Sequence, residues 1–382
     1  MIDVLIDQMT IIAFPNDSLF SENIANWNDV AYWMIVEIED RLHLRQIFGE
    51  RRLKKGGFLS YSTVFEYGEH DDFKFYVGYH YAFKNSGVII YFTAQALHYY
   101  TQTSKLLPFQ VLQKLDSPDY TIRCSRIDVA VDYINEEIDL DSIDKEYGEE
   151  RLSIYSMKDS SGTFCKMRHS QRTITENGKT QTLYFGARKS EAMLRIYDKR
   201  TEQIARVGPY ISDASKSDSW IRFELECKHQ LAHSLTKNIL TIANEAEYKK
   251  LLCNIMIQKF FFTYQIGNQE KNAPFTQQLI DVMNGDLEKI YSYRKTENST
   301  LLRNLRHLFF TSGTIPTLYK IYKIWGEEGL ENATALIKHS VKNHLANVVS
   351  TRFLKNYGMF YRKEYGSFKN YYEKVLKDEL SK

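Results

Sequence analysis

Three segments between residues 126 and 228 alternate charged and apolar side chains, which is the pattern of a β-strand with one polar face. The polar face of the first segment carries Arg126, Asp128, Ala130 and Asp132. That of the second segment carries Arg195, Tyr197 and Lys199. That of the third segment carries Arg222, Glu224, Glu226 and Lys228. If the three strands are neighbours in one sheet, these faces coincide and gather acids, bases and one tyrosine.

The residue types on these faces suit covalent chemistry at a phosphodiester. Carboxylates from two different strands form an oxygen site of the kind that Mg²⁺ or Mn²⁺ prefers, and such an ion polarises a phosphodiester. The phenol of Tyr197 can then attack phosphorus and form a covalent intermediate, while arginine and lysine hold the other phosphate oxygens. The alternative, for each strand taken alone, is a half-exposed sheet face with solvated charges.

The strands and helices expected along the chain predict an α+β fold, in which an antiparallel sheet core carries the active site. Strands are expected at residues 4–14 and in a hairpin of residues 73–83 and 88–92, with helices at residues 28–48 and 95–115, the latter interrupted near Pro108. Residues 156–181 are polar and predict a loop or a long hairpin, and residues 208–219 a second loop.

The character of the chain changes near residue 236, where helical spacing replaces strand patterns. Helices are expected at residues 235–253, 276–294, 301–310, 315–325 and 330–350. We therefore predict two domains, a catalytic α+β domain of residues 1–235 and a helical C-terminal region of residues 236–382.

Composition excludes several classes of protein. Of the 382 residues 43% are hydrophobic and 26% charged, as in ordinary soluble globular proteins. The net charge of +2 means that any DNA-binding surface must come from local clustering. The four cysteines form no CxxC pair, no apolar run approaches the ~20 residues of a membrane span, and the N-terminal segment carries acids where a signal peptide needs basic residues. We expect a cytoplasmic protein that does not enter a membrane.

The three segments resemble the Rep_trans family, which comprises replication initiators of rolling-circle plasmids and integrative elements of Gram-positive bacteria. The most specific part is residues 184–190 followed by residues 194–203, which resemble the family pattern YFG-x-RKS and then RIYDK-x-x-EQ. Residues 126–132 look like its R-x-D-x-x-x-D strand, and residues 222–226 like its R-x-E-x-E strand. The resemblance covers roughly residues 80 to 235.

The resemblance implies an origin-specific DNA nickase and strand transferase. The tyrosine of the RIYDK pattern, here Tyr197, would attack a phosphodiester at the origin, become linked to the 5′ phosphate and free a 3′ hydroxyl that primes synthesis. For Mg²⁺ or Mn²⁺ the leading ligands are Asp128 and Glu224, with Asp132 and Glu226 as second choices. No two of the ten histidines stand at positions i and i+2, so a histidine-pair metal site is excluded.

Basic residues near the tyrosine are the expected contacts to DNA phosphates, and each has a solvated basic side chain as its alternative. They are Arg126, Arg188, Lys189, Arg195, Lys199 and Arg222. The partner that the family implies is double-stranded origin DNA with a locally single-stranded nick site. The family also implies a homodimer, and it leaves open whether a host helicase takes part.

From Lys338 onward basic and aromatic residues are interleaved, which suits contacts to phosphates and unpaired bases. The alternative is a solvated amphipathic helix whose rings pack on the body. The family attributes origin discrimination to its C-terminal region, which favours a role of this region in DNA recognition or dimerisation. A conjugative relaxase with the same chemistry, or a DNA-binding regulator without catalysis, remains an alternative for the whole chain.

Overall fold

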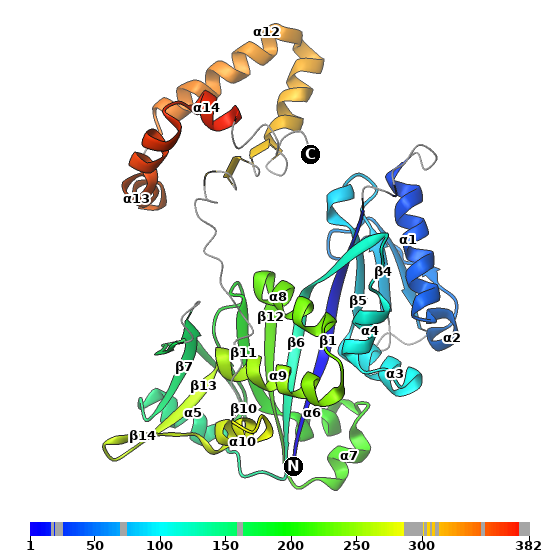
Figure 1. Cartoon of the computed structure of the whole chain (residues 1–382), viewed down its shortest axis with the longest axis vertical. Coiled ribbons are helices and arrows are strands. Elements are labelled where there is room, and N and C mark those ends of the chain that lie inside the picture. Colours follow the sequence, from blue (N-terminus) through cyan, green and yellow to red (C-terminus); the bar gives the residue numbers. More distant parts are fainter. Residues whose placement is uncertain are drawn as a thin grey trace. The chain divides into compact units, whose positions relative to one another are not determined.

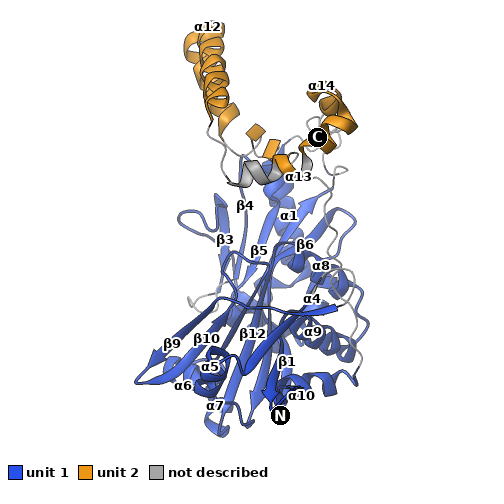
Figure 2. Ribbon diagram, turned by 90° about the vertical axis from the view of Figure 1, so that its left-hand side faces the viewer, with its two compact units in different colours: residues 1–293 blue, residues 294–382 orange. Residues whose placement is uncertain are grey.

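The computed structural model describes residues 1–16, 19, 26–68, 75–158, 163–285, 301, 304–305, 308–309, 313–344 and 348–373. The chain forms two compact units, Met1–Tyr293 and Arg294–Lys382 (Figure 2). The first unit holds every predicted site residue, and the second is helical in its described part. The predicted α+β class, with an antiparallel sheet core and a helical C-terminal region, is confirmed.

A ten-stranded antiparallel sheet forms the centre of the first unit (Figure 1). Its strands, in spatial order, are β2 (Arg52–Leu53), β3 (Thr63–Tyr67), β4 (Phe75–Tyr79), β5 (Val88–Phe92), β1 (Ile2–Pro15), β6 (Tyr120–Ile134), β12 (Trp220–Lys228), β11 (Ala192–Asp198), β10 (Lys179–Phe185) and β9 (Gln171–Glu176). The three segments singled out by their alternation are thus the consecutive neighbours β6, β12 and β11.

Helices pack against the apolar face of this sheet. Ile127, Val129 and Val131 of β6 are fully buried on that face, as period-two alternation predicts. The helices after β12 are α8 (His229–Leu240), which packs on β6 and β12, and α9 (Glu245–Lys259), which packs on β1 and β6. The segment expected as one helix from residue 235 to 253 is therefore two helices. Asn244 caps the start of α9 by accepting a hydrogen bond from the backbone N–H of Glu247.

A second, four-stranded sheet lies beside the main one. Its order is β14 (Gln269–Asn272), β13 (Phe261–Ile266), β7 (Leu152–Lys158) and β8 (Thr163–Lys166), and it is accompanied by α5 (Leu140–Gly148) and α10 (Pro274–Val282). Residues 156–181, expected as a loop or long hairpin, hold the end of β7, β8, and the hairpin of β9 with β10.

The structure divides the chain at residues 293 and 294, later than the predicted boundary at 235 and 236. The reason is that the segment after β12 completes the core of the first unit. The rings of Phe262 and Phe275, from β13 and α10, lie 6.3 and 5.1 Å from that of Phe223 on β12. Such long-range packing leaves no trace in local sequence patterns.

The N-terminal predictions are largely confirmed, with breaks where the backbone requires them. The strand and hairpin appear as β1 and as β4 paired with β5. The first helix is split into α1 (Trp27–Arg41) and α2 (Leu44–Phe48), because His43 adopts a left-handed φ of 52°. The second is split into α3 (Ala94–Ser104) and α4 (Pro108–Lys114), and Pro108 occupies the first turn of α4, where proline is tolerated.

The second unit contains α12 (Thr314–Lys342), α13 (Val348–Tyr365) and α14 (Phe368–Tyr371). Gly326, with φ 66° and ψ −155°, interrupts α12, and none of the residues of this helix is buried. Tyr371 packs its ring against Tyr361 and Tyr365, at 5.6 and 4.9 Å. Much of the helix expected at 301–310, and the end of the one expected at 276–294, lie outside the described residues. No helix in the described part of the chain is long and apolar enough to cross a membrane.

Candidate active site

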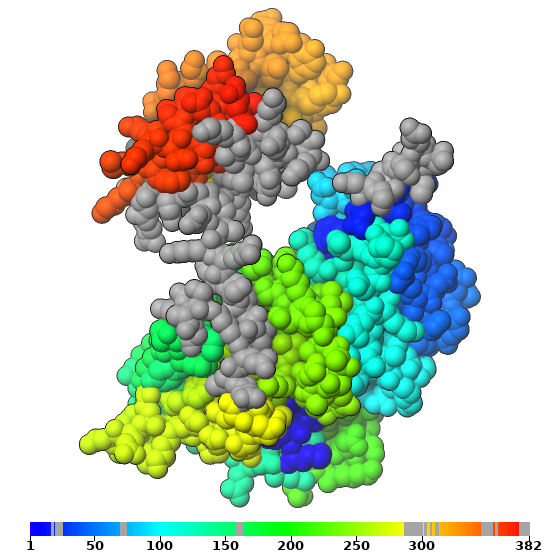
Figure 3. Space-filling view, viewed as in Figure 1, coloured from blue at the N-terminus to red at the C-terminus, as the bar shows by residue number. Residues whose placement is uncertain are grey.

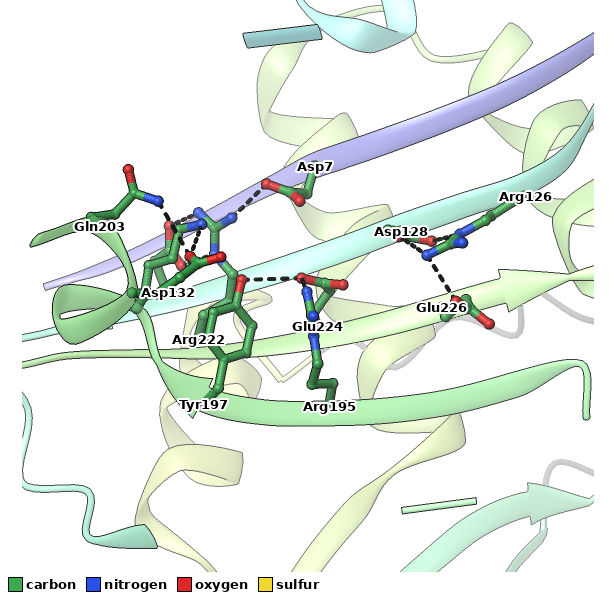
Figure 4. A network of polar contacts seen from close by, with 12 residues as sticks. Asp7, Arg126, Asp128, Asp132, Arg195, Tyr197, Gln203, Arg222, Glu224 and Glu226 are labelled. Atoms are coloured by element: carbon green, nitrogen blue, oxygen red, sulfur yellow. Dashed lines mark hydrogen bonds and ion pairs between the residues drawn. The ribbon is translucent and has the colours of Figure 1, made fainter. Parts of the chain in front are cut away.

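The polar faces of β11, β12 and β6 coincide, as the alternation predicted (Figure 4). Tyr197 of β11 lies opposite Arg222 of β12, which in turn lies opposite Asp132 of β6. One step along the sheet, Arg195 lies opposite Glu224, which lies opposite Ala130. The register therefore places the tyrosine of β11 and the acids of β12 and β6 on one surface.

Tyr197 is 5% exposed, and its hydroxyl donates a hydrogen bond to Oε2 of Glu224 at 3.2 Å. Burial, followed by the negative charge of Glu224, raises the pKa of this phenol well above its usual value. The guanidinium carbon of Arg195 lies 4.5 Å from the centre of the ring, and the same guanidinium donates to Glu224 at 2.6 Å. The phenol is thus neutral at rest, with a proton acceptor and a cation in contact.

The helix after the tyrosine strand adds a second cation. Lys199 begins α6 (Lys199–Arg206), and its ammonium nitrogen lies 5.6 Å from the centre of the Tyr197 ring and 2.7 Å from Oε2 of Glu202. Asp198 caps this helix by accepting from the backbone N–H of Thr201. Its side chain therefore serves the helix rather than the polar face, in agreement with the alternation.

Beneath the tyrosine lies a buried ion triad that includes a residue not singled out from the sequence. Arg222 is fully buried and donates to both carboxylate oxygens of Asp132, at 2.6 and 2.7 Å, and to Asp7 of β1 at 2.5 Å. Burial acts to raise the pKa of Asp7, but the cations Arg222, Lys199 and Arg195 outweigh it and hold that pKa below its usual value. Asp7 is therefore ionised within the polar face.

Asp7 lies on this face at a β-bulge. Ile6 pairs with Val129 and Gln8 with Asp128, so that Asp7 is an extra residue in the register. The small side chain of Ala130 lies between Asp128 and Asp132 on the polar face of β6. The bulge has a signal in the sequence, because the apolar positions of β1 run Val4, Ile6 and then Met9 and Ile11, with one interval of three.

A third ionic group lies further along the same strands. Arg126 donates to both oxygens of Asp128, at 2.8 and 2.7 Å, and lies 2.8 Å from Glu226. Lys228 also pairs with Glu226, at 2.5 Å. Burial raises the pKa of Asp128 to about 7, against the lowering effect of the bonds from Arg126 and with a further increase from Glu224.

A pocket of about 300 Å³ opens over Tyr197. Its charged lining residues are Asp7, Glu202, Glu224, Glu226, Arg126, Arg195, Lys199 and Arg206. Of the predicted site residues, Asp128, Asp132 and Arg222 do not line it. Arg222 has no exposed surface, so the structure assigns it to holding carboxylates and not to a DNA phosphate. Arg188 and Lys189 are exposed in the turn between β10 and β11 and do not line the pocket either.

The oxygen ligands expected for a metal ion are mostly engaged by guanidinium groups. Among the described residues no three acids, histidines or cysteines are grouped closely enough to hold an ion by themselves. Asp7 and Glu224, however, both line the pocket and both act on the phenol of Tyr197. Within the part of the chain that the structure describes, no hydrogen bond reaches Oδ2 of Asp7 or Oε1 of Glu224. Mg²⁺ commonly takes one or two carboxylates and completes its shell with water and phosphate oxygens, and this pair fits that pattern.

Comparisons with known proteins agree with the sequence and the fold. A family model described as replication initiation factor, Rep_trans, matches residues 122–341, more than half of the chain. Among solved structures, the rolling circle replication initiator protein from Geobacillus stearothermophilus is similar in fold, with a TM-score of 0.53 and 18% sequence identity over 76% of this chain and 99% of that one. The comparison with curated proteins finds no match.

Proposed function

The chain belongs to the replication initiation factor family, and from this premise we propose that it nicks one strand of origin DNA and transfers that strand to start rolling-circle replication. The observation that carries the proposal is the hydrogen bond from the Tyr197 hydroxyl to Glu224, in a pocket lined by three arginines and a lysine. A buried phenol paired with a base and surrounded by cations suits attack on a phosphodiester.

In the proposed nicking step Tyr197 passes its hydroxyl proton to Glu224 as its oxygen attacks the scissile phosphorus. The bond from phosphorus to the 3′ oxygen breaks, the leaving oxygen takes a proton from water, and the proton that Glu224 gives up neutralises the hydroxide left behind. The products are a phosphotyrosine diester to the 5′ end of the strand and a free 3′ hydroxyl. Attack by another 3′ hydroxyl on the same phosphorus reverses the step and transfers the strand, so that no other reactant is consumed.

The cations around the phenol determine where the phosphate must lie. Arg195 faces the pocket beside the attacking oxygen, and Lys199 lies over the same ring. We propose that both hold non-bridging oxygens of the scissile phosphate, because charge accumulates on those oxygens in the transition state. Arg126, which also lines the pocket, would hold a neighbouring phosphate. Arg188 and Lys189 stay proposed as contacts to DNA outside the pocket.

We propose that Asp7 and Glu224 hold a divalent ion, Mg²⁺ or Mn²⁺. When bound, such an ion would polarise the scissile phosphate and neutralise the two carboxylates that raise the pKa of Tyr197. Glu226, which lines the same pocket, remains a second choice as ligand. Asp128 and Asp132 are each bound through both oxygens to a guanidinium. They would instead stabilise the polar sheet face that carries Asp7 and Glu224.

The second unit is proposed to contribute DNA recognition or dimerisation. Lys355, Arg362, Lys363 and Lys369 are exposed on α13 and α14, next to exposed rings such as Phe360 and Phe368. Basic side chains that contact phosphates make binding depend on salt. Exchange of these four residues for glutamine should therefore weaken binding to origin DNA and make it less sensitive to salt. The proposed partner is the double-stranded origin with a locally single-stranded nick site.

The test of the central proposal is incubation with a supercoiled plasmid that carries the cognate origin, with and without Mn²⁺. The wild-type protein should relax the plasmid and form a covalent adduct with DNA, whereas Tyr197→Phe should bind the origin without nicking it. Tyr184→Phe is the matched control, because Tyr184 lines the same pocket from β10, and it should still nick. Full nicking by Tyr197→Phe would overturn the proposal.

A further inference from the structure

A second pocket, of about 360 Å³, lies next to the one over Tyr197. Tyr210 lines both pockets and forms the wall between them. Trp220 lines the second pocket and stands two residues before Arg222 on β12, and Arg222 lies opposite Tyr197. At about 3.4 Å per residue, Trp220 is thus roughly 7 Å along the sheet from the level of the tyrosine. This places the second pocket within one or two nucleotides of the proposed scissile phosphate.

The walls of this pocket differ in chemistry from those of the first. Its acids are Asp3, Asp132 and Asp213, with Lys216 as a basic lining residue. Asp213 belongs to α7 (Ile211–Lys216). In Figure 3 the blue N-terminal residues reach the surface beside the green segment that contains α6 and α7. Asp132 is neutralised by Arg222 and Asp3 lies 3.7 Å from the ammonium of Lys249, whereas no side chain of the described residues forms an ion pair with Asp213. The lining side chains of this pocket include three acids and one base, whereas the first pocket has four of each, so the second pocket is the poorer site for a phosphate and a DNA strand would place a different group in it.

The aromatic residues of the pocket suit a planar ligand. The rings of Tyr210 and Trp220 meet edge to face, with centres 5.8 Å apart, and the ring of His98 lies 4.1 Å from that of Tyr210. Leu5 and Ile134 add apolar surface. The volume lies within the ~300–1,000 Å³ that small-molecule pockets usually have. A nucleobase fits these walls, because aromatic side chains bind unpaired bases by stacking.

The polar groups of the pocket specify the edge of the base. Oδ1 of Asp3 accepts from the backbone N–H of Val4 and lies 3.7 Å from Lys249, which leaves its second oxygen for a ligand. Carboxylates only accept hydrogen bonds, so Asp3 and Asp213 together favour a base with two N–H donors on one amino group. Trp220 is 3% exposed, and its indole Nε1–H has no hydrogen-bond acceptor among the described residues. This nitrogen has no exposed surface, so a ring nitrogen or carbonyl oxygen of a base supplies that acceptor when the indole ring turns toward the pocket. Adenine, cytosine and guanine carry an exocyclic amino group that can donate to both carboxylates, whereas thymine has no exocyclic amine and offers only the single donor N3–H.

We propose that this pocket binds the base of a nucleotide next to the scissile phosphate, and that it prefers a base with an exocyclic amino group over thymine. The inference rests on the proposed nicking function for its position on the DNA, but its chemistry can be tested by binding alone. It assigns to Trp220, Asp3 and Asp213 a role in selecting the nick site, separate from the chemistry at Tyr197.

The test uses the full-length Tyr197→Phe protein and fluorescein-labelled single-stranded oligonucleotides that span the cognate nick site. At each of the positions next to the scissile phosphate the base is replaced by thymine or by an abasic residue. At one position either replacement should weaken binding about ten-fold, the size expected when a stacked and hydrogen-bonded base is lost. Adding Asp3→Asn and Asp213→Asn should abolish the penalty for thymine, since asparagine also donates hydrogen bonds. Adding Asp40→Asn instead, an exposed aspartate of α1, should leave the penalty unchanged.

Two outcomes would overturn the pocket proposal. The first is that no flanking position distinguishes thymine from an amino-bearing base. The second is that the penalty for thymine persists in full in the Asp3→Asn, Asp213→Asn protein. Trp220→Phe provides a separate check, because it keeps an aromatic wall and should reduce the penalty for the abasic residue only in part. Failure of the wild-type protein to form a covalent adduct, with base-dependent binding intact, would refute the nicking function and leave the pocket standing.

Discussion

The hydroxyl of Tyr197 and Oε2 of Glu224 lie 3.2 Å apart on neighbouring strands, joined by a diagonal hydrogen bond. The residue directly opposite Glu224 is Arg195, which donates to the same oxygen at 2.6 Å. One carboxylate oxygen thus receives both the proton of the phenol and the charge of the guanidinium. Because the phenol and the guanidinium share one carboxylate oxygen, another cation that binds Glu224 should change how readily Tyr197 loses its proton.

Replacing Glu224 with glutamine should lower the nicking rate strongly while leaving the protein folded. Glutamine keeps the size and one oxygen but cannot accept the proton, and general bases contribute about 10²- to 10⁴-fold to rates. Single-turnover cleavage of an origin oligonucleotide measures the loss. Glu176→Gln, on the exposed strand β9, is the matched control and should nick at the wild-type rate. Equal rates for Glu224→Gln and wild type would exclude Glu224 as the base.

Asp7→Asn should weaken binding of Mn²⁺ by at least the 10- to 100-fold that is typical for losing a partner of a metal ligand. The reason is that Asp7 supplies one of the two pocket-lining carboxylates that keep an oxygen free of hydrogen bonds from the described residues. Titration of the Tyr197→Phe protein with Mn²⁺, followed by electron paramagnetic resonance, measures the affinity without nicking. Unchanged Mn²⁺ affinity in Asp7→Asn would remove this residue from the ligand set. Asp29→Asn, an exposed aspartate in the first turn of α1, serves as the control.

Arg222→Met should destabilise the first unit by about 3–5 kcal/mol, because removing one member of a buried ionic group leaves its partners as uncompensated charges. Asp132 and Asp7 would be those partners. The free energy of unfolding from urea denaturation measures the effect. Adding Asp132→Asn to Arg222→Met should restore part of the lost stability. If the double variant were less stable than Arg222→Met alone, the assigned cause would be mistaken.

Ala130→Leu should abolish nicking through shape alone. Ala130 is fully buried on the polar face of β6, between Leu5 of β1 and Glu224 of β12, and a larger side chain there should displace Glu224 from its place beside Tyr197. Overpacking of this kind costs about 1–3 kcal/mol, so the protein should remain folded, as circular dichroism can show. Ala130→Gly adds no volume and should retain nicking. Wild-type nicking by Ala130→Leu would show that the position of Glu224 beside Tyr197 is not critical.

The stability of the first unit should depend on pH through His169. Burial lowers the pKa of this imidazole below 6.5, and its Nε2 has no hydrogen-bond partner in the described part of the chain. Because the unfolded state then takes up the proton more readily, the stabilisation is complete above pH 6.5 and is lost as the pH falls towards the folded-state pKa. As the pH falls below 6.5, the free energy of unfolding from urea denaturation should decrease less for His169→Phe than for the wild type. His43→Asn, at an exposed site, is the control and should lose stability with falling pH as the wild type does. If His169→Phe loses as much stability as the wild type, His169 is not the group responsible.

The strand faces of the site could be predicted because alternation is a local property. Successive side chains of a strand point to opposite sides wherever the strand lies, so Tyr197, Arg195 and Glu224 could be assigned to polar faces from the sequence. The family pattern around Tyr197 is equally local. Asp198 could be set apart for the same reason, since it falls on the other face and caps the next helix.

The partners of the charged groups were decided by the tertiary structure. Arg222 was predicted to hold phosphate, but the register of three strands and the bulge in β1 enclose it between Asp132 and Asp7. A bulge moves a side chain to the other face, so counting by twos beyond Ile6 misplaces every later residue of β1. The second pocket likewise forms only where β1, β6, β12 and α7 come together in space, and no local sequence pattern predicts it.

The sequence by itself determined the class of fold, the family and the tyrosine at the centre of the proposed chemistry, because each follows from residue types at short spacing. Only the tertiary structure decided which carboxylates face the pocket, which are held by arginine, and where the first unit ends. Those outcomes depend on contacts between residues far apart in the chain, such as Asp7 with Arg222, whose geometry is set by strand register and packing.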